Sequence, residues 1–246
     1  MRTTTNTFDA IVVGGGHAGT EAAAVLCRMG YSTLLLTHSK NTIGQMSCNP
    51  AIGGVGKGHL AKEIDALGGL MARAADLAGI HLKTLNSSKG KAVQATRAQA
   101  DRLLYKSAIQ QQLNQYSKLT VFEGAASRVL IKQDQLCGVE TECGETFKTT
   151  KMVLTVGTFL NGVIHTGRER LSGGRQGDKP SLVLAQQLLE IAPRTGRLKT
   201  GTPPRINKNS IDFNLLEEQP GDDPRPVFSF VSTNEDHPQQ VSCHIT

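Results

Sequence analysis

The sequence is short of aromatic residues and has no tryptophan, with only 7 Phe and 3 Tyr among its 246 residues. Proteins that hold single-stranded nucleic acid by base stacking need aromatic platforms, so that mode of recognition is not expected. The 5 cysteines form no CxxC pair, and no spacing of histidine and cysteine is typical of a metal site. The sequence therefore predicts no bound metal and a chain that is kept reduced in the cytoplasm.

Long apolar runs are also missing. The longest, such as residues 152–160, are interrupted by Thr and Gly and fall short of the about 20 residues that a membrane-spanning helix needs. No cationic and apolar leader precedes the first expected strand. The content of 38% hydrophobic residues and 26 glycines is that of a globular protein. We therefore expect a soluble, cytoplasmic protein that does not bind membranes.

The formal net charge of +6 is unevenly distributed along the chain. Residues 57–106 carry +5 and residues 165–208 carry +6, whereas residues 209–246 carry −6. The basic segments are either solvated faces or a surface for a polyanion, and binding to such a surface weakens as salt rises. In residues 165–208 the arginines alternate with Gly and Pro instead of following helical spacing, which suits phosphate groups.

Glycine-rich residues 14–19 fit the pattern GxGxxG. They are Gly14, Gly15, Gly16, His17, Ala18 and Gly19. The motif follows an expected strand at 8–13, opens an expected helix at 17–30, and precedes a second expected strand at 32–37. In such a unit the first glycine makes the tight turn, the second lets a pyrophosphate approach, and the third lets helix and strand pack. The sequence therefore predicts a dinucleotide site at this turn.

The second strand ends without the acidic residue that usually binds a ribose about 20 residues after the glycine motif. The residues there are Thr37, His38 and Ser39, so the motif alone leaves NAD and FAD open. Strands expected at 119–123, 126–132, 136–141 and 145–148 form a β-meander, and a buried strand is expected at 151–156. This order is similar to that of flavoproteins with two dinucleotide sites, and it favours FAD.

Further helices are expected at 60–78, at 96–115, and from Ser181, which can cap a helix, to residue 191. Loops are expected at 41–59 and 79–94, and a last strand at 241–245. The predicted fold class is α/β, with a Rossmann-like FAD/NAD(P)-binding domain of the glutathione-reductase type that contains a β-meander. We expect that domain to be truncated and to be followed by the start of an inserted domain.

Cys48 lies in the glycine-rich loop after the second strand, on the side of the sheet where a flavin ring is expected. A thiol there could add to an electrophilic ring carbon or donate a proton, and Lys57 or His59 could lower its pKa. We therefore predict that Cys48 is catalytic. The remaining cysteines are expected to be structural: Cys27, Cys137, Cys143 and Cys243.

Five segments resemble the MnmG/GidA family of FAD-dependent tRNA uridine 5-carboxymethylaminomethyl modification enzymes. They are FDAIVVGGGHAGTEAAA (8–24), GQMSCNPAIGGVGKGHLAK (44–62), LNSSKGKAVQATRAQADR (85–102), VLTVGTFL (153–160) and GRLKTGTPPRI (196–206). The resemblance covers essentially the whole chain but only the N-terminal part of the family, whose members are much longer.

The resemblance implies roles for particular residues. Residues 14–19 would hold the FAD pyrophosphate, and Ala126 would contact the adenosine half through its backbone. Ser181 would contact the cofactor at the start of a helix, and Cys48 would act on the uracil ring covalently or as an acid. The resemblance also implies NADH as reductant and methylenetetrahydrofolate as one-carbon donor.

The implied partners are tRNA, modified at its wobble uridine, and the GTPase MnmE in a heterotetramer that contains a homodimer of this protein. The resemblance implies an FAD-binding domain over residues 1–206 and the incomplete start of an inserted NADH-associated domain over residues 207–246. Two alternatives stay open: a folate- and FAD-dependent tRNA uridine methyltransferase, and a non-catalytic FAD-binding fragment.

Overall fold

The computed structural model describes residues 6–46, 49–175, 177–201 and 203–245. Its contacts divide the chain into two compact units, each built from two stretches of sequence. Unit 1 comprises residues 1–44 and 112–199, and unit 2 comprises residues 45–111 and 200–246. The sequence predicts a boundary after residue 206, between a cofactor domain and an inserted domain. That domain assignment stays a prediction.

A parallel sheet of four strands forms the centre of unit 1, in the order β10-β1-β2-β6. The strands are β1 (Ala10–Val13), β2 (Thr33–Thr37), β6 (Leu119–Glu123) and β10 (Met152–Leu154). Helix α1 (His17–Arg28) joins β1 to its parallel neighbour β2 and packs against both. This is the β-α-β unit that the glycine motif predicts, so the predicted Rossmann-like fold class is confirmed.

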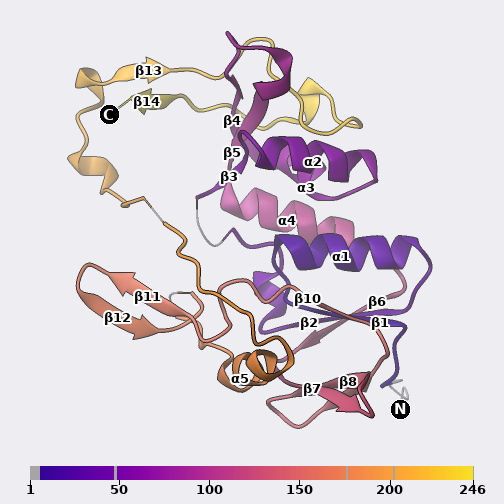
Figure 1. Cartoon of the computed structure of the whole chain (residues 1–246). Helices are drawn as coiled ribbons and strands as arrows, with labels where there is room; N and C mark the ends of the chain where they lie inside the picture. The colour runs from indigo at the N-terminus through magenta and orange to yellow at the C-terminus, as the bar shows by residue number, and fades with distance from the viewer. Residues whose placement is uncertain (1–5, 47–48, 176, 202, 246) are drawn as a thin grey trace. The chain divides into compact units, whose positions relative to one another are not determined.

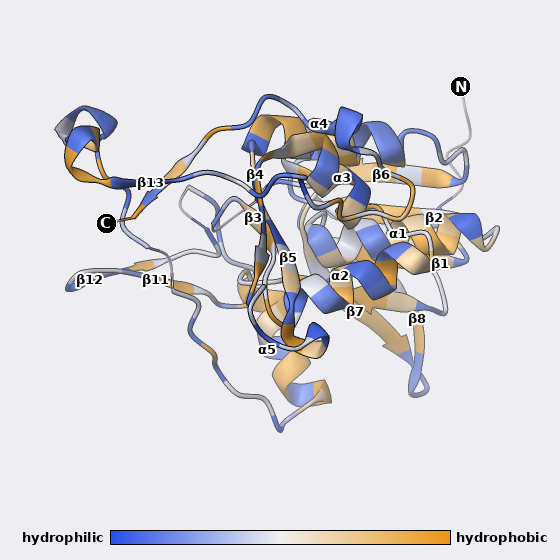
Figure 2. Cartoon of the chain, turned by 90° about the horizontal axis from the view of Figure 1, so that it is seen from above, coloured by the Kyte–Doolittle hydropathy of each residue, from blue (hydrophilic) through white to orange (hydrophobic). Residues whose placement is uncertain are grey.

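The two faces of this sheet bury different partners. Side chains alternate along each strand, so Ile11 and Leu34 share one face and Val12 and Leu35 share the other. The first face packs against β7 (Ala126–Lys132), β8 (Gln135–Thr141), β9 (Thr146–Lys148) and α5 (Leu182–Ile191). Figure 1 shows α1 on one side of the sheet and this layer on the other, and Figure 2 shows the apolar character of the sheet strands.

Strands β7, β8 and β9 form the predicted β-meander. The sequence also places the strand at 119–123 in the meander, but as β6 it pairs in parallel with β2 in the central sheet. A side-chain clamp fixes α5 to the meander, because Gln187 accepts from the Val129 N–H and donates to the Val129 carbonyl, both at 2.7 Å. The hairpin of β11 (Val163–Thr166) and β12 (Glu169–Ser172) lies between β10 and α5 in the sequence.

Unit 2 is built on an antiparallel sheet of three strands in the order β3-β5-β4. Its strands are β3 (Ala51–Gly53), β4 (Gly79–Leu85) and β5 (Ala95–Ala100), and the helices α2 (Lys57–Ala66) and α3 (Met71–Ala78) pack on it. The loop predicted at 79–94 and the first part of the helix predicted at 96–115 are therefore wrong, since both contain strands. Helix α4 (Arg102–Leu113) starts only after Asp101, whose carboxylate accepts from the Leu103 and Leu104 N–H groups.

Residues 217–245 return to this sheet and contribute a two-stranded ribbon of β13 (Glu217–Gln219) and β14 (Cys243–Ile245). The chain between these strands follows β4, where the Asp222 N–H donates to the Leu82 carbonyl at 2.9 Å. The predicted strand at 241–245 is thus found in part. No helix among the described residues combines the length and apolar character needed to cross a membrane.

Charged side chains on α2 and α3 hold residues 228–237, and we call this set of contacts the α2/α3 clasp. Asp76 is fully buried and accepts from the Phe228 and Ser229 N–H groups, both at 2.8 Å. The Asp65 carboxylate accepts from the Ser229 hydroxyl at 2.8 Å and from the Phe230 N–H at 2.7 Å. The clasp therefore ties two helices to a segment that lies far along the sequence.

The outer contact of the clasp is an ion pair whose pKa predicts a pH dependence. Arg73 donates two hydrogen bonds to Asp236, at 2.7 and 2.8 Å. These bonds, followed by one from the Thr233 N–H, lower the pKa of Asp236 from 3.8 to about 2. Because the folded pKa is the lower one, the carboxylate stabilises the fold above about pH 4 and loses that effect as pH falls towards 2.

We expect Asp236→Asn to lower the free energy of unfolding at pH 7 by about 1–2 kcal/mol. The loss is smaller than the full pKa shift implies, because the ion pair is partly exposed and water screens it. The difference from the wild type should shrink between pH 4 and pH 2. Urea unfolding at several pH values measures it. Glu235→Gln, at an exposed neighbouring acid, is the control and should change nothing. A difference that stays constant down to pH 2 would contradict the prediction.

Candidate functional site

The turn between β1 and α1 can be made only by glycine at two of its positions. Gly14 has φ +108°, and a Cβ there would lie 2.5 Å from the carbonyl oxygen of Thr155. A Cβ on Gly19 would lie 1.7 Å from the carbonyl oxygen of Gly14. Both distances are far below van der Waals contact, so α1 can start this close to β1 and β10 only because these side chains are missing.

The carbonyl groups of the turn are all used inside the protein. The bonds run from Thr155 Oγ1 to Gly14 O (3.1 Å), from the Gly44 N–H to Gly15 O (2.9 Å) and from the Thr20 N–H to Gly16 O (2.9 Å). The first N–H groups of a helix have no acceptor inside that helix. The open side of the turn therefore presents donors rather than acceptors, which is the arrangement that binds an anion.

Space for a ligand lies at Gly16. Among the described residues, no heavy atom lies within 4 Å of the position that a Cβ on Gly16 would take. Gly16 is also the N-cap residue of α1, and no side chain caps the helix there. The positive end of the α1 dipole thus faces open space beside a backbone that no side chain covers, and a pyrophosphate group fits such a place. We call this uncovered turn, residues 14–19, the glycine cradle.

The ends of β2 and β10 flank this cradle. Thr155 follows β10 and anchors the turn, since its N–H and its hydroxyl both donate to the Val13 carbonyl, at 2.9 and 2.8 Å. The sequence VLTVGTFL contains Thr155, but its anchoring role was not predicted, because it depends on β10 pairing beside β1. Beyond β2, the ring of His38 packs edge to face on Phe159, with ring centroids 4.9 Å apart.

Two other predicted cofactor residues lie in the same unit as the turn. Ala126 is buried at the start of β7, opposite Thr141 of β8. Ser181 is buried just before α5, and its N–H donates to the Phe159 carbonyl at 2.8 Å. The Ser181 side chain makes no capping hydrogen bond to α5. Their predicted contacts with FAD stay predictions.

Cys48 lies outside the described residues, so its catalytic role also stays a prediction. The groups predicted to lower its pKa have partners of their own. Lys57 Nζ donates to the Ala51 carbonyl at 3.2 Å, and His59 Nδ1 accepts from the Gly56 N–H at 3.3 Å. The second bond makes Nδ1 an acceptor, so the neutral His59 ring carries its hydrogen on Nε2.

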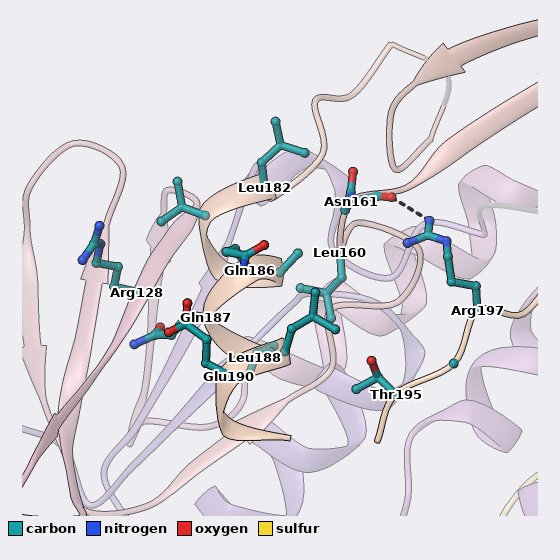
Figure 3. Close-up of a pocket in the computed structure, with 14 residues that line it drawn as sticks. Arg128, Leu160, Asn161, Leu182, Gln186, Gln187, Leu188, Glu190, Thr195 and Arg197 are labelled. Carbon is teal, nitrogen blue, oxygen red and sulfur yellow. Dashed lines mark hydrogen bonds between the residues drawn. The ribbon is translucent and has the colours of Figure 1, made fainter. Parts of the chain in front are cut away.

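A pocket of about 860 Å³ lies along α5 and is drawn in Figure 3. Leu160, Leu182 and Leu188 give it apolar walls, and its lining also includes Arg128 of β7 and Arg197 after α5. Arg197 is tied to the wall by a 2.7 Å hydrogen bond to the Asn161 carbonyl. The pocket shares no lining residue with the glycine turn, and the sequence did not predict it.

No group of three or more His, Cys, Asp or Glu side chains in the part of the chain that the structure describes is placed to hold a metal ion. Most arginines of the predicted polyanion segment 165–208 are exposed on β11–β12 and after α5. The exposed ones are Arg168, Arg170, Arg194, Arg197 and Arg205. Arg175 differs, because it is half-buried and pairs with Asp178.

Residues 9–246 match the family model described as glucose inhibited division protein A. The structures of Aquifex aeolicus GidA in crystal forms II and I match 97% of this chain, with TM-scores of 0.89 and 0.90 and sequence identities of 44% and 45%. The chain covers 41% of each of those chains. The GidA-related protein from Thermus thermophilus matches 75% of this chain and 68% of its own, at 20% identity and a TM-score of 0.55, which indicates a shared fold.

Proposed function

Because the chain belongs to the glucose inhibited division protein A (GidA) family, we propose that it binds FAD and takes part in the modification of tRNA. The observation that carries the proposal is the glycine turn, whose carbonyl groups are bonded inward while Gly16 borders open space among the described residues. Residues 14–19 would hold the pyrophosphate of FAD. Ala126 would meet the adenosine half through its backbone, and Ser181 would contact the cofactor.

The finer chemistry is proposed from the family. The modification is the addition of a 5-carboxymethylaminomethyl or aminomethyl group at the wobble uridine of tRNA. A bound flavin supplies the oxidation-reduction chemistry. Cys48 would act on the uracil ring as a nucleophile that is later released or as an acid. NADH would serve as reductant and methylenetetrahydrofolate as one-carbon donor.

We also propose tRNA and the GTPase MnmE as partners, a homodimer, and a cytoplasmic location. The exposed arginines on β11–β12 and after α5 support the tRNA contact, because guanidinium groups in loops suit phosphates. The chain spans 41% of the length of the Aquifex GidA chains. The activity, substrates and partners of the whole protein therefore belong to the proposal.

Flavin binding is the direct test. The purified chain should retain flavin absorbance after incubation with FAD and desalting, and titration should saturate at one FAD per chain. FMN, which lacks the adenosine diphosphate half, should bind more weakly, because the glycine turn would then have no pyrophosphate to hold. A chain that leaves the column colourless and does not quench flavin fluorescence on titration would refute the proposal.

A second measurement separates the enzymes that share this fold. Nucleoside mass spectrometry of tRNA incubated with the chain, its partner and the proposed substrates should detect the aminomethyl or carboxymethylaminomethyl uridine. Appearance of a methylated uridine instead would indicate a folate-dependent methyltransferase. Bound flavin without any modified nucleoside would indicate a non-catalytic FAD-binding fragment.

A further inference from the structure

The end of β2 poses a problem for ribose recognition. In dinucleotide-binding folds an acidic residue at this place accepts hydrogen bonds from the ribose hydroxyls. The chain has Thr37, His38 and Ser39 there instead. Some other group must take the role of the carboxylate if an adenosine dinucleotide binds at the turn.

Two of the three residues are already committed to the protein. Thr37 is only 6% exposed, and its Oγ1 would lie 2.8 Å from a Cβ on Gly15, so its hydroxyl is buried against the turn. The Ser39 hydroxyl accepts from the Asn41 N–H at 3.3 Å and caps the short helix η1 (Lys40–Thr42). Neither side chain is placed to take over the contact with a ribose.

A carboxylate on the neighbouring strand is committed as well. Glu123 ends β6, the strand next to β2, and its Oε2 accepts from the Lys40 N–H at 2.8 Å. This bond fixes the loop that follows β2. Glu123 therefore supports the backbone around His38 and does not replace the missing acid.

His38 is exposed, and its ring is oriented by an aromatic contact. The His38 and Phe159 rings meet at an interplanar angle of 83°. Phe159 follows β10 and His38 follows β2, and these strands are the two neighbours of β1 in the sheet. Their contact thus brackets the carboxyl end of β1, where the glycine turn begins.

We propose that His38 is the ribose-binding residue of this site and that its imidazole hydrogen-bonds a hydroxyl of the adenosine ribose. This inference rests on the proposed function. A neutral imidazole has one N–H donor and one acceptor nitrogen, and each ribose hydroxyl can serve as either partner. The contact with Phe159 limits the orientations of the ring and so favours one geometry.

Neighbouring charges indicate which ribose the site accepts. Arg175 lies over the Phe159 ring, 5.7 Å from its centroid, but its Nε pairs with Asp178 Oδ2 at 2.6 Å. Sites for a ribose that carries a 2′-phosphate use an arginine to bind that phosphate. Because Asp178 already neutralises Arg175, the site favours an unphosphorylated ribose diol.

The test compares ADP with its 2′-deoxy and 3′-deoxy analogues by calorimetry, on the wild type and on His38→Ala. ADP is the half of FAD that would reach this site. In the wild type, loss of the contacted hydroxyl should weaken binding about 2–10-fold, the usual value of one hydrogen bond. His38→Ala should weaken ADP binding by a similar factor, and in this variant the same deoxy analogue should bind as well as ADP.

Further measurements exclude a purely structural effect. His38→Gln keeps a donor and an acceptor and should restore part of the affinity. His165→Ala, at an exposed histidine on β11, should bind ADP like the wild type. Adenosine 2′,5′-bisphosphate should bind the wild type more weakly than AMP, from which it differs only by the 2′-phosphate.

Three results would overturn the inference. They are unchanged ADP binding by His38→Ala, a deoxy analogue that loses as much affinity in His38→Ala as in the wild type, and tighter binding of the 2′-phosphorylated probe. A wild type that binds neither ADP nor FAD would refute the proposed function itself. If FAD and ADP bind normally but His38→Ala has no effect, only the role of His38 fails.

Discussion

Gly16→Ala should abolish FAD binding and leave the stability of the fold unchanged. Gly16 has φ −79°, an ordinary backbone angle for alanine, and its Cβ would meet no heavy atom of the described residues within 4 Å. The added methyl group would occupy the place where the pyrophosphate approaches the backbone. We expect the affinity to fall at least about 100-fold, which corresponds to about 3 kcal/mol.

Gly19→Ala, in contrast, should destabilise the fold itself. Its Cβ would lie 1.7 Å from the Gly14 carbonyl oxygen, so α1 would have to move away from β1. We expect a loss of about 3 kcal/mol in the free energy of unfolding, as for other overpacked sites, and a loss of FAD binding with it. Flavin titration and urea unfolding of both variants measure the two effects separately.

Gly90→Ala is the matched control for both variants, because Gly90 has φ −61° and open space around it among the described residues. It should change neither FAD affinity nor stability. If Gly16→Ala binds FAD within twofold of the wild type, the pyrophosphate of FAD does not lie at this turn. A Gly19→Ala variant as stable as the wild type would show that α1 can shift without penalty.

Asp76→Ala should cause the second large effect, a loss of about 3–5 kcal/mol in the free energy of unfolding. The carboxylate is fully buried and accepts from two backbone N–H groups, of Phe228 and Ser229. A buried His237 also lies beside it, with Nε2 at 3.3 Å. Removal of the acceptor would leave buried donors without a partner, and this costs more than the bonds themselves contribute.

Two control variants separate the effect of burial from the loss of a carboxylate as such. Asp212→Ala removes an exposed carboxylate that accepts from the Asn214 N–H, and it should lower stability by less than about 1 kcal/mol. Asp76→Asn keeps one carbonyl acceptor and should fall between the wild type and Asp76→Ala. Urea unfolding followed by circular dichroism measures all three. A loss below about 1 kcal/mol for Asp76→Ala would show that residues 228–237 do not depend on this carboxylate.

The parts of unit 1 that can be predicted from the sequence are those whose signals are local. The glycine motif between an apolar strand and an alanine-rich helix predicts β1, α1 and β2 with boundaries close to those observed. The short alternating strands predict the meander. For residues 119–123 the strand itself is predicted, but its partner is not. Pairing with β2 is a contact between distant residues, and local alternation does not identify which strand will be the neighbour.

Unit 2 is harder to predict because local preference and tertiary contacts disagree there. Residues 95–100 read ATRAQA, which contains good helix formers, and this composition predicts a helix. They form β5, the central strand between β3 and β4. The alternation of buried Ala98 and Ala100 with less buried Arg97 and Gln99 is a strand signal that the composition hides.

The candidate site shows the same division. The cradle at residues 14–19 follows from the motif, whereas the anchoring by Thr155 and the orientation of His38 by Phe159 require β10 to lie beside β1. Nothing local marks Asp76 as buried, because its donors lie 152 and 153 residues further along the chain.

The α2/α3 clasp also has a consequence for the order in which the two units fold during translation. Its bonds join positions 152 to 165 residues apart, so at about 5–20 residues per second a ribosome completes them roughly 10–30 s after the helices emerge. Unit 1 ends at residue 199 and can be assembled before residues 228–230 are synthesised. During translation, Asp65 and Asp76 therefore remain without these partners while all residues of unit 1 are already available. We expect the nucleotide-binding turn to form first and unit 2 to complete its packing last.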